Sequence, residues 1–373
     1  MGYLNVMRIE YATAKDDALL KYFFEQEIIN GAIDYKVLRP AGFFAHSAQN
    51  YDETSVLKLT NEQNEIHGLV SINTRDALIS EWSRLGWITD LRLSSNRKAI
   101  VYWFENFLEE IQKIKTEKHL DHLFTFINKT NIGTLNAFIR PRNLRPNLPR
   151  FHLISNFYRT SIFCKVPSLT IPLQSVRIRS LDMNNIEALA NYLQKKKEGR
   201  LLAYRYSATL LKERLERWHN FTEENFLIAY DSKGNIVGCA APWNAKETQQ
   251  YHIVSYSDFY QSMQALLKIP SSMGLTKNLP SAGSTADFYF LTHLAADNPY
   301  IFHRLLSESL EFCKPEQYII YSSFEGDHMM RPPKDFIHIK QKFGLYLVLN
   351  PEDNLPFSHL SQHLLPDFEV AFL

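Results

Sequence analysis

The sequence predicts an α/β (α+β) fold built from two similar halves in tandem, each a mixed, mostly antiparallel sheet flanked by helices. The first observation is the stretch 87–111, which alternates apolar and polar residues, passes through a short polar loop and continues with apolar residues at helical spacing. The second is an internal repeat, because residues 225–238 (NFLIAYDSKGNIVG) resemble residues 55–68 (SVLKLTNEQNEIHG) at a constant offset of 170 residues. A strand, loop and helix that recur along one chain favour a duplicated unit.

The composition fits two ordinary folded domains. The chain has 373 residues, of which 45% are hydrophobic and 13% aromatic, and this length is comfortable for two domains. We place their boundary at residues 165–174 (KVPSLTIPLQ), because the two prolines suit a linker. The predicted domains are therefore residues 1–166 and residues 174–373.

Charge and cysteine content exclude several classes of protein. The formal net charge is +1, so we expect no bulk electrostatic attraction to nucleic acid or to an anionic membrane. No apolar run approaches the roughly 18 residues that span a bilayer. The three cysteines lie far apart without C-x-x-C spacing, which argues against a disulfide framework or a zinc site and suits a reducing cytoplasm. We therefore expect a cytoplasmic protein with no metal centre and no membrane or nucleic-acid partner.

The first half is read from its periodicity. Alternating apolar and polar residues predict strands, and the second and third of these form a hairpin around the polar turn 61–64. Apolar residues at helical spacing predict helices, the first with Thr13 as its N-cap. The predicted strands are residues 7–12, 54–60, 66–73, 87–93, 123–128 and 157–164, and the predicted helices are residues 16–29, 100–111 and 131–139. Residues 31–51 fit either a loop or a short helix, and the proline-rich connector 140–150 cannot be regular structure.

The second half repeats this order from residue 176. The predicted strands are residues 176–181, 287–296, 318–324 and 344–350 and the hairpin 225–238, and the predicted helices are residues 186–193 and 301–312. An insertion, residues 245–285, separates the third and fourth strands of this half. One copy therefore has the order β-α-(α)-β-β-β-α-β-α-β.

The loop after the strand 87–93 is a candidate anion site. Residues 94–98 (SSNRK) lie at the start of the following helix, where unpaired backbone N–H groups and the positive end of the helix dipole point at one spot. Such a site suits a pyrophosphate. The alternative is an ordinary strand, loop and helix with Arg and Lys side chains at the surface.

The run 90–93 (DLRL), the loop SSNR and the amphipathic helix after it resemble strand four, loop and helix three of the GNAT acyl-CoA N-acyltransferases. In that family the loop carries Arg/Gln-x-x-Gly-x-Gly/Ala, and its amides hold the coenzyme A pyrophosphate. Arg97 matches the first position of this motif, whereas Ile100 and Tyr102 replace the small residues. Residues 225–244 (NFLIAYDSKGNIVGCAAPWN) are similar to a block in the second copy of tandem-GNAT proteins. The resemblance therefore covers nearly the whole chain.

This resemblance implies an acyl-CoA co-substrate, most simply acetyl-CoA, bound by the first copy. The strand would contact the pantetheine arm, and the loop and helix start would hold the pyrophosphate. The cofactor-binding residues that the resemblance assigns are Leu91, Arg92, Leu93, Ser94, Arg97, Lys98, Ala99, Ile100 and Asn131. We expect the strand 87–93 to part from the strand 123–128 at Leu93, so that the thioester-bearing arm enters between them.

The implied chemistry needs a base that takes a proton from the acceptor amine, and amides that stabilise the oxyanion. The candidate bases are Asp90, on the key strand, and Glu81, in the loop before it. For Asp90 the alternative is a surface ion pair with Arg92 or Arg97. The tyrosine that serves as general acid in many members of the family is replaced by Phe138, which cannot donate a proton.

The second copy departs from the pyrophosphate motif. Its loop, residues 297–300 (DNPY), has no glycine and no basic residue before His303. Pro299 has no N–H to offer a phosphate, and Asp297 would repel one. We expect this copy to bind no coenzyme A pyrophosphate and to act as a structural wall for the first copy.

Three functions remain open from the sequence. The first is a GNAT-type N-acyltransferase (acetyltransferase), which transfers an acetyl or other acyl group from coenzyme A to an amine of a small molecule or peptide. The second is a catalytically inactive GNAT-fold binding or interaction module, which the replacements at Ile100, Tyr102 and Phe138 favour. The third is a relative that transfers a peptidyl or aminoacyl group from charged tRNA, since such enzymes also pair two GNAT domains.

Overall fold

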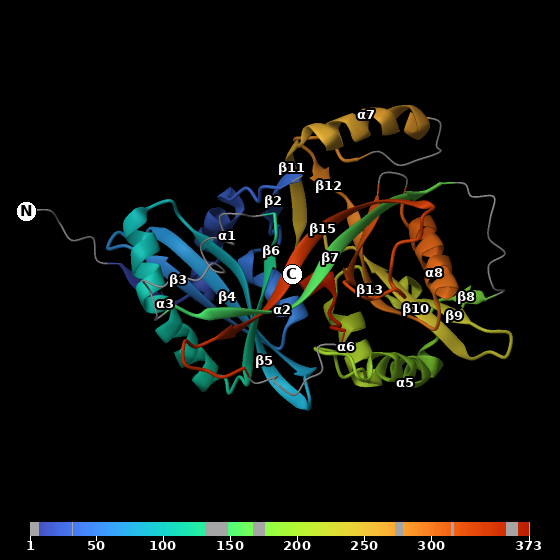
Figure 1. Cartoon of the computed structure of the whole chain (residues 1–373), viewed down its shortest axis with the longest axis horizontal. Coiled ribbons are helices and arrows are strands. Elements are labelled where there is room, and N and C mark those ends of the chain that lie inside the picture. The colour runs from blue at the N-terminus through green and yellow to red at the C-terminus, as the bar shows by residue number, and fades with distance from the viewer. Residues whose placement is uncertain are drawn as a thin grey trace, which may run out of the picture.

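A twelve-stranded sheet runs through the molecule in the order β1-β3-β4-β5-β6-β15-β7-β14-β13-β10-β9-β8 (Figure 1). The structure is a computed structural model and describes residues 7–31, 33–130, 148–166, 176–272, 279–314, 317–355 and 365–372. Neighbouring strands are antiparallel except in two parallel pairs, β5 with β6 and β13 with β14. These two pairs occupy matching places in the two halves.

The first half contributes six strands to this sheet. Its strands are β1 (Arg8–Tyr11), β3 (Glu53–Thr60), β4 (Ile66–Leu78), β5 (Trp82–Leu93), β6 (His122–Asn128) and β7 (Arg150–Lys165), and its helices are α1 (Asp17–Gln26), α2 (Phe43–Asn50) and α3 (Arg97–Glu117). The predicted strands at 66–73 and 87–93 are confirmed, each as part of a longer strand. The ambiguous stretch 31–51 forms the strand β2 (Ile33–Leu38) and α2. The predicted helix 131–139 lies outside the described residues.

The second half repeats the order of the first. Its strands in the long sheet are β8 (Arg177–Arg179), β9 (Leu227–Tyr230), β10 (Ile236–Trp243), β13 (Phe288–Ala296), β14 (Tyr318–Phe324) and β15 (Phe336–Leu349), and its helices are α5 (Ile186–Lys197), α6 (Ala208–Arg217) and α8 (Pro299–Phe312). The predicted strand 318–324 is confirmed at both ends. The helix α6 was not predicted, because only Leu211 and Arg214 are buried in its charged sequence.

The closing strands of the two halves are exchanged. β7 ends the first half, yet it pairs with β14 of the second half over Phe157–Ile162. β15 ends the second half, yet it pairs with β6 of the first half over Phe343–Val348. The two closing strands also pair with each other through the centre of the molecule (Figure 1). The hydrogen-bonded sheet is therefore continuous across the predicted domain boundary at residues 165–174.

Helices cover both faces of the sheet in the same way in each half. α3 packs on β1, β3, β4 and β5, and α8 packs on β9, β10, β13 and β14. Alternate residues of a strand face opposite sides, so Leu57 lies under α3 while Val56 faces the core that contains α1. The side chains that α3 buries recur at helical spacing and are Ala99, Trp103, Phe107, Ile111 and Ile114. Each large apolar side chain of this kind contributes roughly 1.5–3 kcal/mol to stability.

The core on the α1 and α5 face is continuous between the halves. It joins Phe24 of α1 with Leu189 of α5 and with the C-terminal residues Phe368 and Phe372. The cores under α3 and under α8 are separate clusters. The two halves therefore share one face of their interior as well as the sheet.

The insertion 245–285 forms structure of its own. Its strand β11 (Gln250–Tyr256) pairs with β12 (Thr285–Ala286) and, over Ile33–Leu38, with β2 of the first half. These three strands form a second sheet, and the helix α7 (Asp258–Ser272) follows β11. The insertion thus links the second half to the segment of the first half that the sequence left ambiguous.

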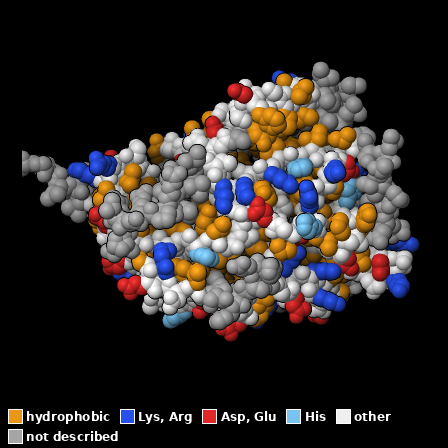
Figure 2. All heavy atoms as spheres, in the orientation of Figure 1, with side chains coloured by type: hydrophobic (Ala, Val, Ile, Leu, Met, Phe, Trp, Pro, Cys, Tyr) orange, Lys and Arg blue, Asp and Glu red, His pale blue; other side chains and the backbone are white. Residues whose placement is uncertain are grey.

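One face of the surface shows basic side chains over the middle of the long sheet and a hydrophobic region beneath α7 (Figure 2). Within the described residues, the helices are all too short or too polar to cross a membrane.

Candidate functional site

The strands β5 and β6 form a fork. They pair only over Leu85–Ile88 of β5 and His122–Thr125 of β6, while β5 continues to pair with β4 on its other side up to Leu93. At the point of parting, the Thr125 hydroxyl donates a hydrogen bond of 2.9 Å to the Ile88 carbonyl. The strands therefore part earlier than the expected Leu93, and the residues beyond Ile88 face an open cleft.

The cleft has a volume of about 380 Å³. Its walls come from β5, β6 and α3 of the first half and from the exchanged strand β15, and they include Leu91, Arg92, Leu93, Phe107, Phe126, Asn128 and Phe343. The large rings at the start of α3 do not line this cleft, because Trp103 is fully buried between α3 and the sheet and Tyr102 packs against the same core. Of the predicted cofactor residues, Leu91, Arg92 and Leu93 are therefore at the cleft.

Asp90 lies on a β-bulge at this fork. Its φ of +54° is in the left-handed region, and the pairing of β4 with β5 shifts register between Leu69 and Ser71. A bulge redirects a side chain out of the strand's alternation, and Asp90 lines the cleft. Its carboxylate pairs with Arg39 at 3.1 Å, and the Arg39 side chain is only 2% exposed. The ion pair is thus with a buried arginine that the sequence did not single out, rather than with Arg92 or Arg97.

Glu27 is a second carboxylate at the cleft, and no motif or periodicity in the sequence indicates it. It follows the last residue of α1 and pairs with Arg92 at 2.8 Å. Burial raises the pKa of Glu27 above its ordinary value, and the positive charge of Arg92 opposes this rise. A carboxylate with a raised pKa is a better proton acceptor near neutral pH.

The start of α3 is already capped. Asn96 is the N-cap, and its side-chain oxygen accepts hydrogen bonds from the amides of Lys98 (2.9 Å) and Ala99 (3.4 Å). The Ile100 amide donates to the Asn96 carbonyl as an ordinary helical hydrogen bond. Three of the amides that the resemblance assigns to a pyrophosphate are therefore satisfied within the protein. Arg97 and Lys98 remain exposed beside them.

The remaining predicted residues are dispersed. The Ser94 amide donates to the His67 carbonyl at 2.8 Å, which fixes the start of the loop beside the cleft. Glu81 is exposed in the turn between β4 and β5, at the end of β5 opposite the fork, so the structure does not bring it to Asp90. Asn131 and Phe138 lie outside the described residues. Within the described part of the chain, no three His, Cys, Asp or Glu side chains gather in a way that could hold a metal ion.

The second half has a matching fork, and the protein's own C-terminal segment fills it. β13 pairs with β14 only at its start, over Phe288–Phe290. Beyond that point the buried side chain of Glu369 accepts a hydrogen bond of 2.6 Å from the His293 amide, and the Ser322 hydroxyl donates to the Phe368 carbonyl at 2.6 Å. The segment 367–372 is buried throughout. A ligand could enter this fork only by displacing that segment.

The start of α8 in the second half carries Pro299 and Asp297, the two residues expected to disfavour a phosphate. Asn298 caps α8 by accepting from the amides of Tyr300 and Ile301, both at 3.0 Å, and Pro299 is the first helical residue. Asp297 stands beside this end and pairs with Lys196 at 2.8 Å. These features agree with the expectation that the second half holds no pyrophosphate, which stays a prediction.

Comparisons with known proteins identify the fold. The chain is similar to a GCN5-related N-acetyltransferase from Sphaerobacter thermophilus, with a TM-score of 0.53 and 9% identity over 94% of this chain and 98% of that one. It is also similar to Saccharomyces cerevisiae N-myristoyltransferase solved with myristoyl-CoA bound, with a TM-score of 0.56 and 8% identity over 99% of this chain and 91% of that one. No protein-family model and no curated protein sequence matches the chain. The likenesses confirm the predicted fold, two GNAT-type halves in tandem.

Proposed function

We propose that this protein is an acyl-CoA-dependent N-acyltransferase, which transfers an acyl group, most simply acetyl, from coenzyme A to the amine of a small molecule or peptide. The observation that carries the proposal is the open fork of the first half. Beyond Ile88, the edge of β5 that faces β6 has no strand partner among the described strands. An extended ligand can hydrogen-bond to such an edge as an added strand would, and the amide-bearing pantetheine arm of coenzyme A is a ligand of this kind.

In this proposal the cofactor lies along β5 and ends at α3. Leu91, Arg92 and Leu93 bind the pantetheine arm, and the exposed side chains of Arg97 and Lys98 neutralise the phosphates. The Asn96 side chain occupies the amides that would otherwise bind the pyrophosphate, so the phosphates either displace this cap or bind beside it. The acyl thioester then reaches the fork near Asp90.

The proposed reaction is an aminolysis of the thioester. The neutral amine attacks the thioester carbonyl, a C–N bond forms, and the C–S bond breaks to release coenzyme A as the thiolate. The amine loses a proton to a carboxylate, either Asp90 or Glu27, and the thiolate takes a proton from water. Asp90 is held toward the cleft by the bulge and by Arg39, whereas Glu27 has the raised pKa.

The proposal is tested by calorimetric titration with acetyl-CoA, followed by an assay for free coenzyme A thiol with a panel of amines. We expect saturable binding and amine-dependent thiol release. A titration without detectable heat at millimolar acetyl-CoA would argue strongly against the proposal.

A second candidate is a non-catalytic module that keeps the fold and binds coenzyme A, or another ligand, without chemistry. The capped amides at α3 and the tight pairing of Asp90 with Arg39 favour it. Binding of acetyl-CoA without turnover on any amine would support this candidate over the transferase. Turnover would exclude it.

A further inference from the structure

Two further cavities lead away from the fork and meet at Arg159. The first, of about 140 Å³, has Asp90, Arg39 and Arg159 among its lining residues. The second, of about 80 Å³, is the tyrosine pocket, whose lining includes Tyr35, Tyr251, Tyr256, Tyr260 and Tyr318. Arg159, Tyr35 and Tyr251 line both cavities. Arg159 therefore stands at the passage between the cleft and the tyrosine pocket.

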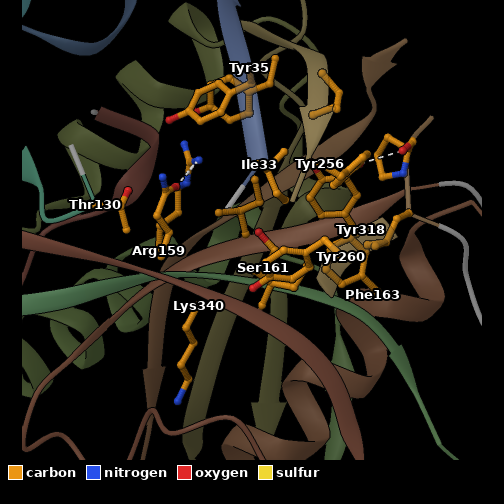
Figure 3. Close-up of a pocket in the computed structure, with 17 residues that line it drawn as sticks. Ile33, Tyr35, Thr130, Arg159, Ser161, Phe163, Tyr256, Tyr260, Tyr318 and Lys340 are labelled. Carbon is orange, nitrogen blue, oxygen red and sulfur yellow. Dashed lines mark hydrogen bonds between the residues drawn. The ribbon is translucent and has the colours of Figure 1, made fainter. Parts of the chain in front are cut away.

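The Arg159 side chain is held in place by aromatic rings from both halves. It rises from the exchanged strand β7 toward Tyr35, whereas Lys340 of β15 points away from the pocket (Figure 3). Its guanidinium lies 5.0 Å from the centre of the Tyr35 ring and 4.9 Å from that of Tyr251. One nitrogen donates a hydrogen bond of 2.5 Å to Gln341. These contacts and a hydrogen bond with the Tyr35 side chain orient the guanidinium without supplying a carboxylate.

No carboxylate lies within ion-pair distance of Arg159 in the part of the chain that the structure describes. Three buried cations do have such partners, since Arg39 pairs with Asp90, Lys197 with Asp367 and Arg214 with Glu369. Among the described residues the buried Arg75 also lacks one, but aromatic rings enclose it and, unlike Arg159, it lines neither of these two cavities. The Tyr251 phenol does not supply the missing charge, because burial raises its pKa above the ordinary value and keeps it neutral. A cation in the interior without a counter-charge is costly, so this position favours an anionic ligand.

A row of contacts connects this cation to the fork. Asp90 pairs with Arg39, and Arg39 donates a hydrogen bond of 2.6 Å to Gln249. Gln249 in turn donates one of 2.8 Å to the Tyr251 hydroxyl, and the Tyr251 ring faces Arg159. Polar contacts thus lead from the candidate base to the Tyr251 hydroxyl, and the ring of the same tyrosine lies against the Arg159 guanidinium. A ligand in this cavity meets the carboxylate of Asp90 and the positive charges of Arg39 and Arg159.

Resting on the proposed N-acyltransferase function, we propose that the acceptor is a free amino acid with an apolar or aromatic side chain. Its carboxylate binds the Arg159 guanidinium, and its amine faces Asp90 and the thioester. Its side chain enters the tyrosine pocket, whose walls also include Ile33, Phe163 and Ile320. Arg159 suits this role because the planar guanidinium binds a carboxylate through two parallel hydrogen bonds.

The experiment compares an acid with its amide on the wild-type protein. Phenylalanine and phenylalaninamide are titrated calorimetrically, with and without coenzyme A, and then assayed as acceptors of acetyl-CoA. We expect the acid to bind about 10- to 100-fold more tightly than the amide, as for a hydrogen bond to a charged group. Equal binding and turnover of acid and amide would overturn the inference. Turnover of peptide amides only, with no response to any free amino acid, would overturn it as well.

The variant R159Q tests the residue itself. We expect it to raise the KM for phenylalanine about 10- to 100-fold while the affinity for acetyl-CoA and the KM for phenylalaninamide stay unchanged. R177Q, which removes an exposed arginine of β8, is the matched control. If R159Q does not fold, R159K keeps the charge and loses the paired hydrogen bonds, and an unchanged KM for phenylalanine in R159K would contradict the inference. If the protein binds phenylalanine but does not bind acetyl-CoA, the carboxylate site at Arg159 is retained and the transferase proposal alone is overturned.

Discussion

Two asparagine N-caps control whether the first amides of α3 and α8 are free to bind an anion. Asn96 and Asn298 each accept two amide hydrogen bonds at the first turn of α3 and α8. An N-cap side chain stabilises a helix by occupying the same N–H groups that would bind a phosphate. At Asn96 the cap therefore competes with the proposed cofactor.

Replacing Asn96 by glycine should strengthen the binding of acetyl-CoA. Glycine is a tolerated N-cap that costs only a few tenths of a kcal/mol relative to asparagine, and it frees the Lys98 and Ala99 amides for the pyrophosphate. We expect several-fold tighter binding by calorimetry. The control is N298G, which frees the equivalent amides of the second half and should leave the affinity unchanged. An equal effect of both variants would show that the helix start of the first half is not the phosphate site.

Asp90 and His293 occupy matching bulges. Both have a φ near +50° and both contact an arginine, Arg39 for Asp90 and Arg214 for His293. The open fork carries the carboxylate and the filled fork carries the histidine. This asymmetry assigns the proton transfer in our proposal to the first half.

The D90N variant should lower kcat while acetyl-CoA still binds. Loss of a general base costs about 10²- to 10⁴-fold in rate, and asparagine keeps the shape of the side chain. E81Q is the matched control, because Glu81 is exposed at the far end of the same strand. Thiol release with a saturating amine measures both. A normal kcat in D90N would show that Asp90 is not the base and would point to Glu27 instead.

Two buried histidines should make stability depend on pH. Burial lowers the pKa of His46 and of His293 well below the ordinary value. Arginine can only donate, so the 2.7 Å contact from Arg214 requires an unprotonated nitrogen on His293. Below pH ~6.5 the unfolded chain binds more protons than the folded chain does. As the pH is lowered, the free energy of unfolding should therefore decrease by up to about 1.4 kcal/mol per pH unit for each histidine. Urea denaturation between pH 7.5 and 5.5 measures this, and H46Q should reduce the slope by up to one proton.

The sequence identified Asp90 and the strand beneath it, but it did not identify Arg39 or Glu27. The alternation of 87–93 and the resemblance together marked one strand, and that strand lines the cleft. Arg39 follows β2, whose sequence fitted a loop or a helix equally well, and its contact with Asp90 depends on a bulge that no periodicity shows. Residues that reach a site from distant segments leave no local pattern.

At the scale of elements, the C-terminal segment is the main difference between the two forks. Phe368 packs against Phe126 and Phe157 with ring centres 4.7 Å apart in each case, and against Phe324 at 5.0 Å. These rings come from β6, β7 and β14, so one side chain joins both halves. The segment thus closes the second fork and supports the wall of the first.

The F368A variant should lose about 3–5 kcal/mol of unfolding free energy, as large aromatic-to-alanine changes in cores do. Denaturant unfolding measures the loss. L355A serves as control, since Leu355 is 44% exposed and should change stability by no more than ~0.5 kcal/mol. A small effect of F368A would mean that the segment rests on the core without stabilising it.

The strands of the second sheet could not be predicted from the sequence. The strands of the long sheet could be predicted because each alternates and recurs in the second copy. β11 and β2 have no counterpart in the repeat, and their pairing joins residues about 200 positions apart. Only the folded chain brings these two edges together.

At the scale of the whole molecule, the exchanged strands set the unit of stability. The repeat predicted the tandem fold of two similar halves, which is confirmed, but order along the chain does not state which half a closing strand completes. Because β7 and β15 each pair with the opposite half, neither half contains its own complete sheet.

Fragments 1–166 and 174–373 should therefore fail to fold separately and should form a stable complex when co-expressed. Alone, each fragment exposes the unpaired edge of its fifth strand and an unpaired closing strand, which is an aggregation hazard. Limited proteolysis and circular dichroism of each fragment and of the co-expressed pair measure this. A cooperative unfolding transition in fragment 1–166 alone would support two independent domains at the predicted boundary.

The exchange also fixes the order of events during synthesis. When β6 emerges from the ribosome, the strand that will lie beside it, β15, has not yet been translated. The nascent first half must keep an incomplete sheet edge from self-association until β15 has been translated. The proposed cofactor cleft, which has Phe343 of β15 in its wall, thus forms only after the second half has been synthesised.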